Sequence, residues 1–359
     1  MGQEKEEDAL QKERNPGVDL LRLAAMFMVC VLHVMGPGGV MDALAGRSLS
    51  RIMAANMLYG LCYGAVDCFA LISGYVGAGR PFRYSSVLRF WLQVFFYSGG
   101  ITLFYAIVEP QKVGPEQIRG AFFPVLTKQY WYVTAYMGLL LLEPVLNAGL
   151  AALSKRQKAV LAGSILLVFS ASSYRFEEVF GTEKGYSMLW LVLLYLVGGC
   201  LKELRLKQWQ AWLCLLLYPA AALGLKTGGQ YVSIGYVLGS IGLLLFLAHL
   251  PFPAWLGRTI SRLGPLAFGV YLIHVHPIIY NSYMYFRYRG LAELRAPSML
   301  MQILLASAQI FLPCLAIEAV RALLFRILHI NALCRWVDIL PGRALDALAR
   351  LRNRQEETV

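Results

Sequence analysis

Hydrophobic stretches of membrane-spanning length recur along the chain and are separated by short polar segments. A stretch of about 20 apolar residues is long enough to cross the hydrocarbon core of a bilayer as a helix. The stretches are continuously apolar rather than alternating, which favours helices over the strands of a membrane barrel. We therefore predict ten spanning helices, at roughly 17–36, 56–78, 86–108, 130–150, 159–175, 187–201, 208–225, 231–250, 264–284 and 299–326.

The composition agrees with a body embedded in a membrane. Of the 359 residues, 58% are hydrophobic and 15% are charged, whereas soluble domains carry about 25% charged residues. These values exclude a disordered chain, a collagen-like chain and a typical soluble enzyme. The predicted fold class is all-α: a polytopic integral membrane protein, without a large soluble domain.

The net charge of +12 could suggest a nucleic-acid partner. Membrane proteins, however, concentrate Lys and Arg in their cytoplasmic loops. If the N-terminus lies inside, the cytoplasmic segments hold about twice as many Lys and Arg residues as the outer segments. We therefore predict an N-in, C-in topology, with the lipid bilayer as partner and no nucleic acid.

The chain divides into three parts on this topology. Residues 1–16 form a charged cytoplasmic N-terminal segment, 17–326 form the membrane domain, and 327–359 form a basic cytoplasmic tail. In the tail, leucines such as Leu340 and Leu345 alternate with arginines such as Arg343, which fits an amphipathic helix on the inner leaflet. A solvated tail explains this pattern equally well.

Three ionisable residues lie in or beside the first predicted span. Arg22 precedes His33 by eleven residues, about three helical turns or roughly 16 Å. Asp19 precedes Arg22 by three residues and can pair with it, so all three share about the same face. Ionisable groups in hydrocarbon are costly and usually functional. The alternatives are an interfacial ion pair for Asp19 and Arg22, and a buried structural role for His33.

The second span also contains a carboxylate. Asp67 falls near the middle of the membrane, where a carboxylate needs a partner. Ser73-Gly74-Tyr75 follows at the inner end of this span. These residues are candidates for a functional role, and the alternative is that the small ones allow close helix packing.

Three arginines follow the second span at the predicted inner face of the membrane. Arg80 and Arg83 are three residues apart, and Arg89 opens the third span. Basic groups with this spacing could bind phosphates. A simple topology signal is the alternative interpretation.

Two later spans contain further polar and aromatic candidates. Glu143 precedes Pro144, which should kink the fourth helix. Trp131 and Tyr136, in the same span, could stack on a sugar ring at the outer mouth or belong to an interfacial aromatic belt. In the ninth span, His274 and His276 are two residues apart and cannot bind one metal as an i,i+4 pair would.

No metal or nucleotide motif is present. The sequence lacks a phosphate-binding GxxxxGK[ST] loop, a GxSxG nucleophile elbow and a His–Glu metal motif. The seven cysteines are odd in number and without metal-type spacing. We expect no metal site, no disulfide framework and no tightly bound cofactor.

Four features together resemble one known family. They are Asp19-Leu-Leu-Arg22 followed by ten residues and His33; Phe69-Ala-Leu-Ile-Ser73-Gly74-Tyr75 after Asp67; Arg80-Pro-Phe-Arg83 with Arg89; and the Trp131-Tyr-Val-Thr-Ala-Tyr136 run before Pro144, with Tyr271-Leu-Ile-His274 late in the chain. In this order the chain resembles acyltransferase family 3, whose members are multi-spanning membrane acyltransferases. The likeness extends over about 14–326.

The resemblance implies transfer of an acyl group, most simply acetyl, from cytoplasmic acyl-CoA to a hydroxyl of a cell-surface glycan or its lipid-linked precursor. A bacterial plasma membrane is the implied location, and O-acetylation of an envelope polysaccharide is the implied role. Because a thioester is already activated, the enzyme must mainly orient it and deprotonate the acceptor, for which histidine is suited.

The resemblance also implies a role for each candidate residue. The catalytic set is His33, as base or transient acyl carrier, with Arg22 and with Asp19 to orient it. The donor-binding set is Arg80, Arg83, Arg89 and Ser73. The substrate-binding set is Asp67, Tyr75, Trp131, Tyr136, Glu143 and His274.

Two other functions remain open on the sequence. A secondary transporter of a small polar or anionic solute also uses intramembrane ionisable residues at helix breaks. It should show internal repeat symmetry, and we find no repeat. A structural or biogenesis partner without catalysis is the second alternative, but it would not need His33 and Arg22 on one face.

Overall fold

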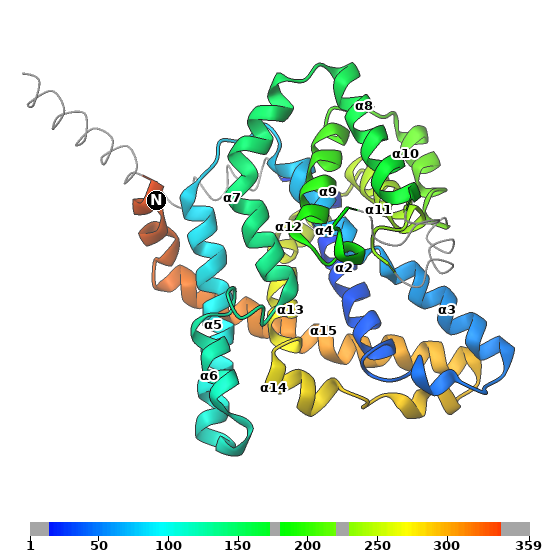
Figure 1. The fold of residues 1–359 in the computed structure, drawn as a ribbon, viewed down its shortest axis with the longest axis vertical. Helices are drawn as coiled ribbons and strands as arrows, with labels where there is room; N and C mark the ends of the chain where they lie inside the picture. The colour runs from blue at the N-terminus through cyan, green and yellow to red at the C-terminus, as the bar shows by residue number, and fades with distance from the viewer. Residues whose placement is uncertain (1–13, 173–179, 220–229, 339–359) are drawn as a thin grey trace, which may run out of the picture.

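The computed structural model describes residues 14–172, 180–219 and 230–338, and within these ranges the regular structure is entirely helical. The helices pack around α2 and α4, which lie at the centre of the body (Figure 1). The longer helices are α2 (Pro16–Met35), α3 (Leu49–Tyr63), α4 (Ala65–Gly77), α5 (Tyr84–Val108), α7 (Trp131–Ala152), α8 (Lys155–Ile165), α9 (Met188–Leu201), α11 (Ile234–Ala248), α12 (Ala254–Leu263) and α15 (Ala296–Ile327). The shorter ones are α6 (Pro115–Phe122), α10 (Gln208–Leu215), α13 (Ala267–His274) and α14 (Pro277–Ile279).

The central helix α2 has a well-defined start. The Asn15 side chain accepts hydrogen bonds from the backbone N–H groups of Gly17 and Val18, and Pro16 occupies the first turn, where no N–H is needed. Gly17 also permits contact with α11, because a Cβ there would lie 1.7 Å from the carbonyl oxygen of Leu247. We call the end of the body where α2 begins the proximal end, and the end where α2 finishes the distal end.

The second predicted span, 56–78, is the later part of a longer, interrupted element. Helices α3 and α4 together run from Leu49 to Gly77, over 29 residues, and meet at Gly64. The Ser240 hydroxyl donates a hydrogen bond of 2.9 Å to the Gly64 carbonyl oxygen at this junction. The interruption places Asp67 in the first turn of α4.

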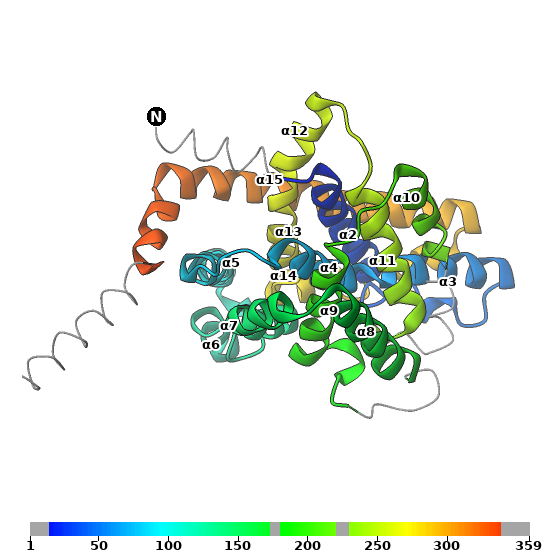
Figure 2. The same cartoon turned by 90° about the horizontal axis from the view of Figure 1, so that it is seen from above.

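Helices α4 and α9 make the most extensive helix pair in the described part of the chain, and both views show them side by side (Figures 1 and 2). Glycine allows their backbones to approach. A Cβ at Gly74 would lie 1.9 Å from the carbonyl oxygen of Tyr195, and a Cβ at Gly198 would lie 2.1 Å from that of Leu71. The close helix packing that the sequence analysis considers for Ser73-Gly74-Tyr75 is therefore present at Gly74.

The ninth predicted span, 264–284, is not one continuous helix. Helix α13 ends at His274 and α14 begins at Pro277, and the segments on either side of the break are bent by 61°. Pro277 cannot donate a backbone hydrogen bond to the preceding turn, so the helix must restart there. The His276 side chain caps the restart by accepting a hydrogen bond from the Ile278 N–H.

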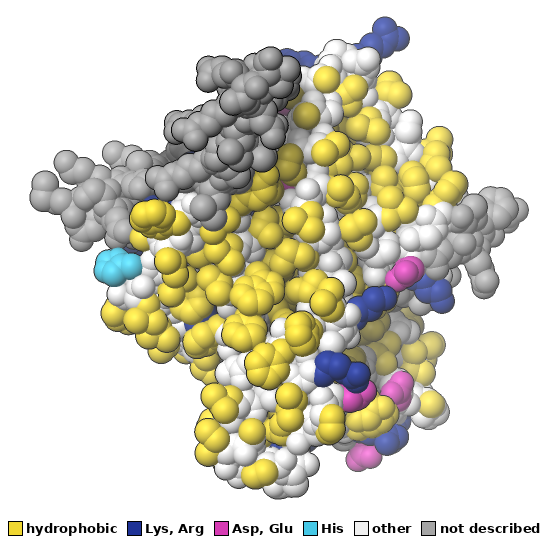
Figure 3. Space-filling view, turned by 60° about the vertical axis from the view of Figure 1, so that its left-hand side comes forward, with side chains coloured by type: hydrophobic (Ala, Val, Ile, Leu, Met, Phe, Trp, Pro, Cys, Tyr) yellow, Lys and Arg dark blue, Asp and Glu magenta, His cyan; other side chains and the backbone are white. Residues whose placement is uncertain are grey.

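Five helical segments in the described residues, one of them the combined α3–α4 element, are long and apolar enough to cross a membrane. They correspond to predicted spans one, two, three, four and ten, and the bent pair at α13 and α14 would make a sixth. The apolar helices α9 and α11 are shorter, and the last residues of predicted spans five and seven, 173–175 and 220–225, lie outside the described ranges. One face of the molecule is dominated by hydrophobic side chains, as expected of a surface in contact with lipid (Figure 3).

The chain remains helical over 330–338, after α15. Asp338 there accepts a hydrogen bond of 2.8 Å from the backbone N–H of Ser85, at the start of α5. Partial burial opposes ionisation of Asp338, but the bond from Ser85 and the nearby Arg83 and Arg89 guanidinium groups lower its pKa overall. The predicted amphipathic pattern at Leu340, Arg343 and beyond lies outside the described residues.

Candidate functional site

The three ionisable residues of α2 form two separate polar groups. At the proximal end, Arg22 is hydrogen-bonded to the buried carboxylate of Asp19. Arg14 also binds Asp19, with Nε and Nη2 at 2.9 and 2.6 Å from its two oxygens. Asp19 thus fixes two guanidinium groups at the start of α2, as the i,i+3 spacing predicts for Arg22. His33 lies near the distal end of the same helix.

A second histidine contacts His33. The Nδ1 atom of His33 lies 2.9 Å from Nε2 of His274, and Nδ1 of His274 lies 2.6 Å from the carbonyl oxygen of Val270. A carbonyl only accepts, so Nδ1 of His274 carries the proton and its Nε2 is an acceptor. Nδ1–H of a neutral His33 then donates to that acceptor. The remaining nitrogen of His33, Nε2, is thereby left with a free lone pair.

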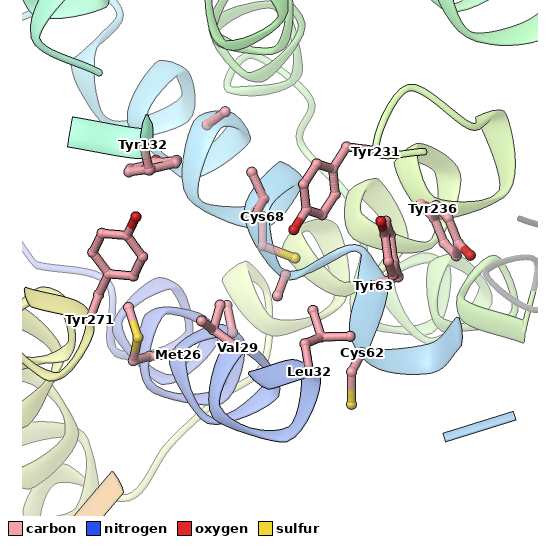
Figure 4. Close-up of a cluster of buried hydrophobic side chains, with 14 of the residues drawn as sticks. Met26, Val29, Leu32, Cys62, Tyr63, Cys68, Tyr132, Tyr231, Tyr236 and Tyr271 are labelled. Carbon is pink, nitrogen blue, oxygen red and sulfur yellow. The ribbon is translucent and has the colours of Figure 1, made fainter. Parts of the chain in front are cut away.

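His33 lies on the wall of an aromatic-rich cavity of about 440 Å³ at the distal end of the body. Figure 4 shows several of its lining side chains within a cluster of buried hydrophobic residues, with Met26 and Val29 of α2 on one side and Tyr132 and Tyr231 on the other. Nε2 of His33 has no hydrogen-bond partner in the described part of the chain. The cavity therefore offers a basic nitrogen beside a space large enough for a small ligand group.

Aromatic rings in contact with one another form the distal mouth of this cavity. The ring centroids of Trp131 and Tyr186 are 4.7 Å apart, those of Tyr186 and Tyr231 are 4.8 Å apart, and those of Tyr63 and Tyr231 are also 4.8 Å apart. Tyr59 lies beside Tyr63, at 5.4 Å. Such a wall can stack on a flat apolar face of a ligand, and it contains Trp131 but not Tyr136, the two residues for which the sequence analysis considers stacking.

Below the inner end of the cavity, three helices each present a polar residue. The cavity is lined by Met26 of α2, Phe69 of α4 and Tyr132 of α7. Four residues closer to the proximal end, the same three helices carry Arg22, Ser73 and Tyr136. Four residues correspond to about one helical turn. The Ser73 and Tyr136 hydroxyl oxygens lie 3.2 Å apart, within hydrogen-bond distance, and the Arg22 guanidinium lies near Tyr136. These three residues therefore form one polar layer beneath the cavity.

The structure places the remaining substrate-binding candidates away from the cavity wall. Asp67 is fully buried, and its Oδ1 accepts a hydrogen bond of 3.0 Å from the indole N–H of Trp190. Glu143 accepts a bond of 3.4 Å from the Tyr195 hydroxyl. Tyr75 lies near the proximal end of α4. His274 contacts His33 rather than the cavity.

The three arginines considered for phosphate binding lie in two different places. Arg80 interacts electrostatically with Glu143 and with Lys202 at the end of α9. Arg83 and Arg89 instead lie close to Asp338, beyond α15. The three arginines therefore do not form one cluster, although they are close together in the sequence.

Several cavity residues were not identified from the sequence. Tyr59, Tyr186, Tyr231 and Asn281 come from the ends of four segments far apart in the chain. The predicted topology could have indicated them, because on the N-in arrangement all four residues fall at the outer ends of the predicted spans. In the described ranges, no group of three or more His, Cys, Asp or Glu residues could hold a metal ion.

A family model described as an acyltransferase domain matches residues 15–318. The match includes α2, both histidines and the whole cavity wall. No curated protein and no solved structure matches the chain.

Proposed function

The chain belongs to acyltransferase family 3, and on this premise we propose that it moves an acetyl group from cytoplasmic acetyl-CoA to a hydroxyl of a cell-surface glycan or its lipid-linked precursor. Membership of the family makes the protein a membrane acyltransferase in general terms. The donor, the acetyl group and the glycan acceptor are the content of the proposal.

The observation that carries the proposal is the pairing of His33 with His274 at the wall of the cavity. With Nδ1–H of His33 held by His274, Nε2 of His33 is directed to act as a general base. The acceptor hydroxyl gives its proton to Nε2 while its oxygen attacks the thioester carbonyl carbon. The carbon–sulfur bond then breaks, and the leaving CoA thiolate takes from His33 the proton that came from the acceptor hydroxyl.

The aromatic mouth supports a sugar as the acceptor. Sugar rings present C–H faces that stack on aromatic side chains, and Trp131 and Tyr231 are nearly parallel, with an interplanar angle of 22°. Asn281 and Gln129, which also line the cavity, supply amide groups for sugar hydroxyls. An acceptor entering from the distal end would present its hydroxyl to His33.

The polar layer of Arg22, Ser73 and Tyr136 supports entry of the donor from the opposite end. Its position, about one turn below the cavity, suits the polar amide and carbonyl groups of an extended donor arm. Asp19 holds Arg22 in place and is therefore a positioning residue. Arg80, Arg83 and Arg89 remain candidates for the phosphates of CoA.

We place the protein in a bacterial plasma membrane with ten spans, both termini in the cytoplasm and the proximal end facing inward. The excess of Lys and Arg in the segments at that end supports this orientation. The membrane domain then extends over 17–326, between the cytoplasmic segments 1–16 and 327–359.

The direct test is acyl transfer in membranes. Membranes containing the protein should release free CoA from acetyl-CoA when a glycan acceptor is supplied, and those containing His33→Ala should not. Mass spectrometry of surface glycans from cells with and without the gene would then identify the acetylated hydroxyl. Identical glycans and no CoA release would contradict the proposal, and solute uptake without acetyl-CoA would favour a secondary transporter.

A further inference from the structure

A second pocket, of about 580 Å³, opens at the proximal end of the body. It lies where α4, α7 and α9 end and α8 begins, on the side of the membrane to which we assign the cytoplasm. Its wall is strongly basic. The charged residues that line it are Lys155, Lys158, Lys202, Glu203 and Arg205.

The cations of this pocket are only partly neutralised. Lys158 forms an ion pair with Glu203, and the Lys202 ammonium donates to the carbonyl oxygen of Ala78. Lys155 and Arg205 have no ion pair among the described residues. Partial desolvation and the nearby Arg80 guanidinium lower the pKa of Lys202. A bound anion would relieve this repulsion.

The backbone adds to the positive potential. Lys155 and Lys158 lie in the first turn of α8, an eleven-residue helix capped by Ser154. The N-terminus of a helix carries a partial positive charge and unpaired N–H groups that favour anions such as phosphate. The pocket thus combines fixed lysine and arginine charges with a helix end.

Polar residues connect this pocket with the catalytic end of the body. Arg80 lies near both Lys202, which it repels, and Glu143, which it attracts; the Tyr195 hydroxyl bonds to Glu143 and, at 2.8 Å, to Asn147. Glu143 in turn lies near Tyr136, a member of the polar layer under the cavity. By contrast, Arg83 and Arg89 already have Asp338 as a neighbouring anion.

We propose that the pocket formed by Lys155, Lys158, Lys202 and Arg205 binds phosphate groups, and that they belong to the nucleotide end of the acyl-CoA donor. The identification of the donor rests on the proposed function. An anionic lipid headgroup shares the same phosphate chemistry and is the other possible source.

The experiment measures binding of adenosine 3′,5′-bisphosphate, of CoA and of pantetheine, which lacks phosphates, to the full-length protein in detergent. The test variant is Lys155→Gln with Arg205→Gln, because both residues are exposed and lack ion pairs. Arg258→Gln is the matched control, being an exposed arginine of α12 outside the pocket. We expect each of the two substitutions to weaken binding of adenosine 3′,5′-bisphosphate and of CoA about tenfold. Binding of pantetheine should not change, and Arg258→Gln should bind all three probes as the parent does.

The outcomes separate this inference from the proposed function. If the double variant binds CoA as the parent does while the parent transfers acetyl groups, the pocket assignment is wrong and the function stands. Phosphatidylglycerol added to the detergent micelles is the lipid probe. If the parent binds no nucleotide but binds this lipid, and the double variant does not, the pocket binds lipid phosphate and the donor assignment is wrong. If the parent binds none of these probes, the pocket is not a phosphate site.

Discussion

His33 of α2 and His274 of α13 are joined by a hydrogen bond of 2.9 Å between Nδ1 of the first ring and Nε2 of the second. They are 241 residues apart in the chain. The bond to the Val270 carbonyl fixes the tautomer of His274, and His274 fixes that of His33. Nε2 of His33 thus keeps a free lone pair that can accept a proton, and His274 holds the His33 ring in this tautomer.

Replacement of His33 by alanine should abolish acetyl transfer. Loss of a general base typically reduces a rate by about 10²- to 10⁴-fold. The measurement is acetyl transfer per molecule of inserted protein, with insertion checked by the amount recovered from membranes. A His33→Ala protein that inserts normally and transfers at the parental rate would remove His33 from the mechanism, without affecting the family assignment.

Replacement of His274 should reduce kcat through His33. We expect His274→Ala to lower kcat by less than His33→Ala does, because Nε2 of His33 survives but its tautomer is no longer fixed, and to leave KM for acetyl-CoA unchanged. In the His33→Ala background, His274→Ala should cause no additional loss. Independent, multiplicative losses from the two substitutions would show that His274 does not act through His33.

Replacement of His276 should affect stability rather than chemistry. His276 is buried, caps α14 through Ile278, and its Nε2 lies 3.3 Å from both the Thr102 hydroxyl and the Ser98 carbonyl oxygen. His276→Ala should therefore lower the melting temperature in detergent, by an amount that corresponds to about 1–3 kcal/mol. The rate per folded molecule should stay near the parental value. A normal melting temperature with lost activity would instead assign His276 to the reaction.

Parts of the site within one helix were predictable from the sequence. The i,i+3 spacing predicts the pair of Asp19 and Arg22, and the structure contains it. The eleven-residue spacing places His33 at the other end of the same helix. Local periodicity is sufficient here because the partners share one rigid element.

Contacts between distant segments were not predictable. The pairing of His33 with His274 depends on where α13 stops, and that is set by Pro277 and by the cap at His276. Similarly, Asp338 reaches the start of α5 only because the chain bends after α15. No local pattern in the sequence encodes such a meeting, since it depends on how whole helices pack.

The position of the C-terminus can be measured directly. The excess of Lys and Arg on one side motivates an even number of spans with both ends in the cytoplasm. A phosphatase fused after the tail should be inactive, and a cytoplasmic fluorescent reporter at the same position should be active. An active phosphatase fusion would refute the ten-span count, because it would place the tail on the other side of the membrane.

Replacement of Gly74 by alanine should disrupt the packing of α4 on α9. Its Cβ would lie 1.9 Å from the backbone oxygen of Tyr195, a contact that neither helix can avoid by moving a side chain. Overpacking of this kind costs about 1–3 kcal/mol, so the variant should melt at a lower temperature and accumulate less in membranes. Gly149→Ala is the matched control, because nothing lies within 4 Å of its Cβ position. Equal stability of the two variants would show that the close approach of α4 and α9 at Gly74 is not required for the fold.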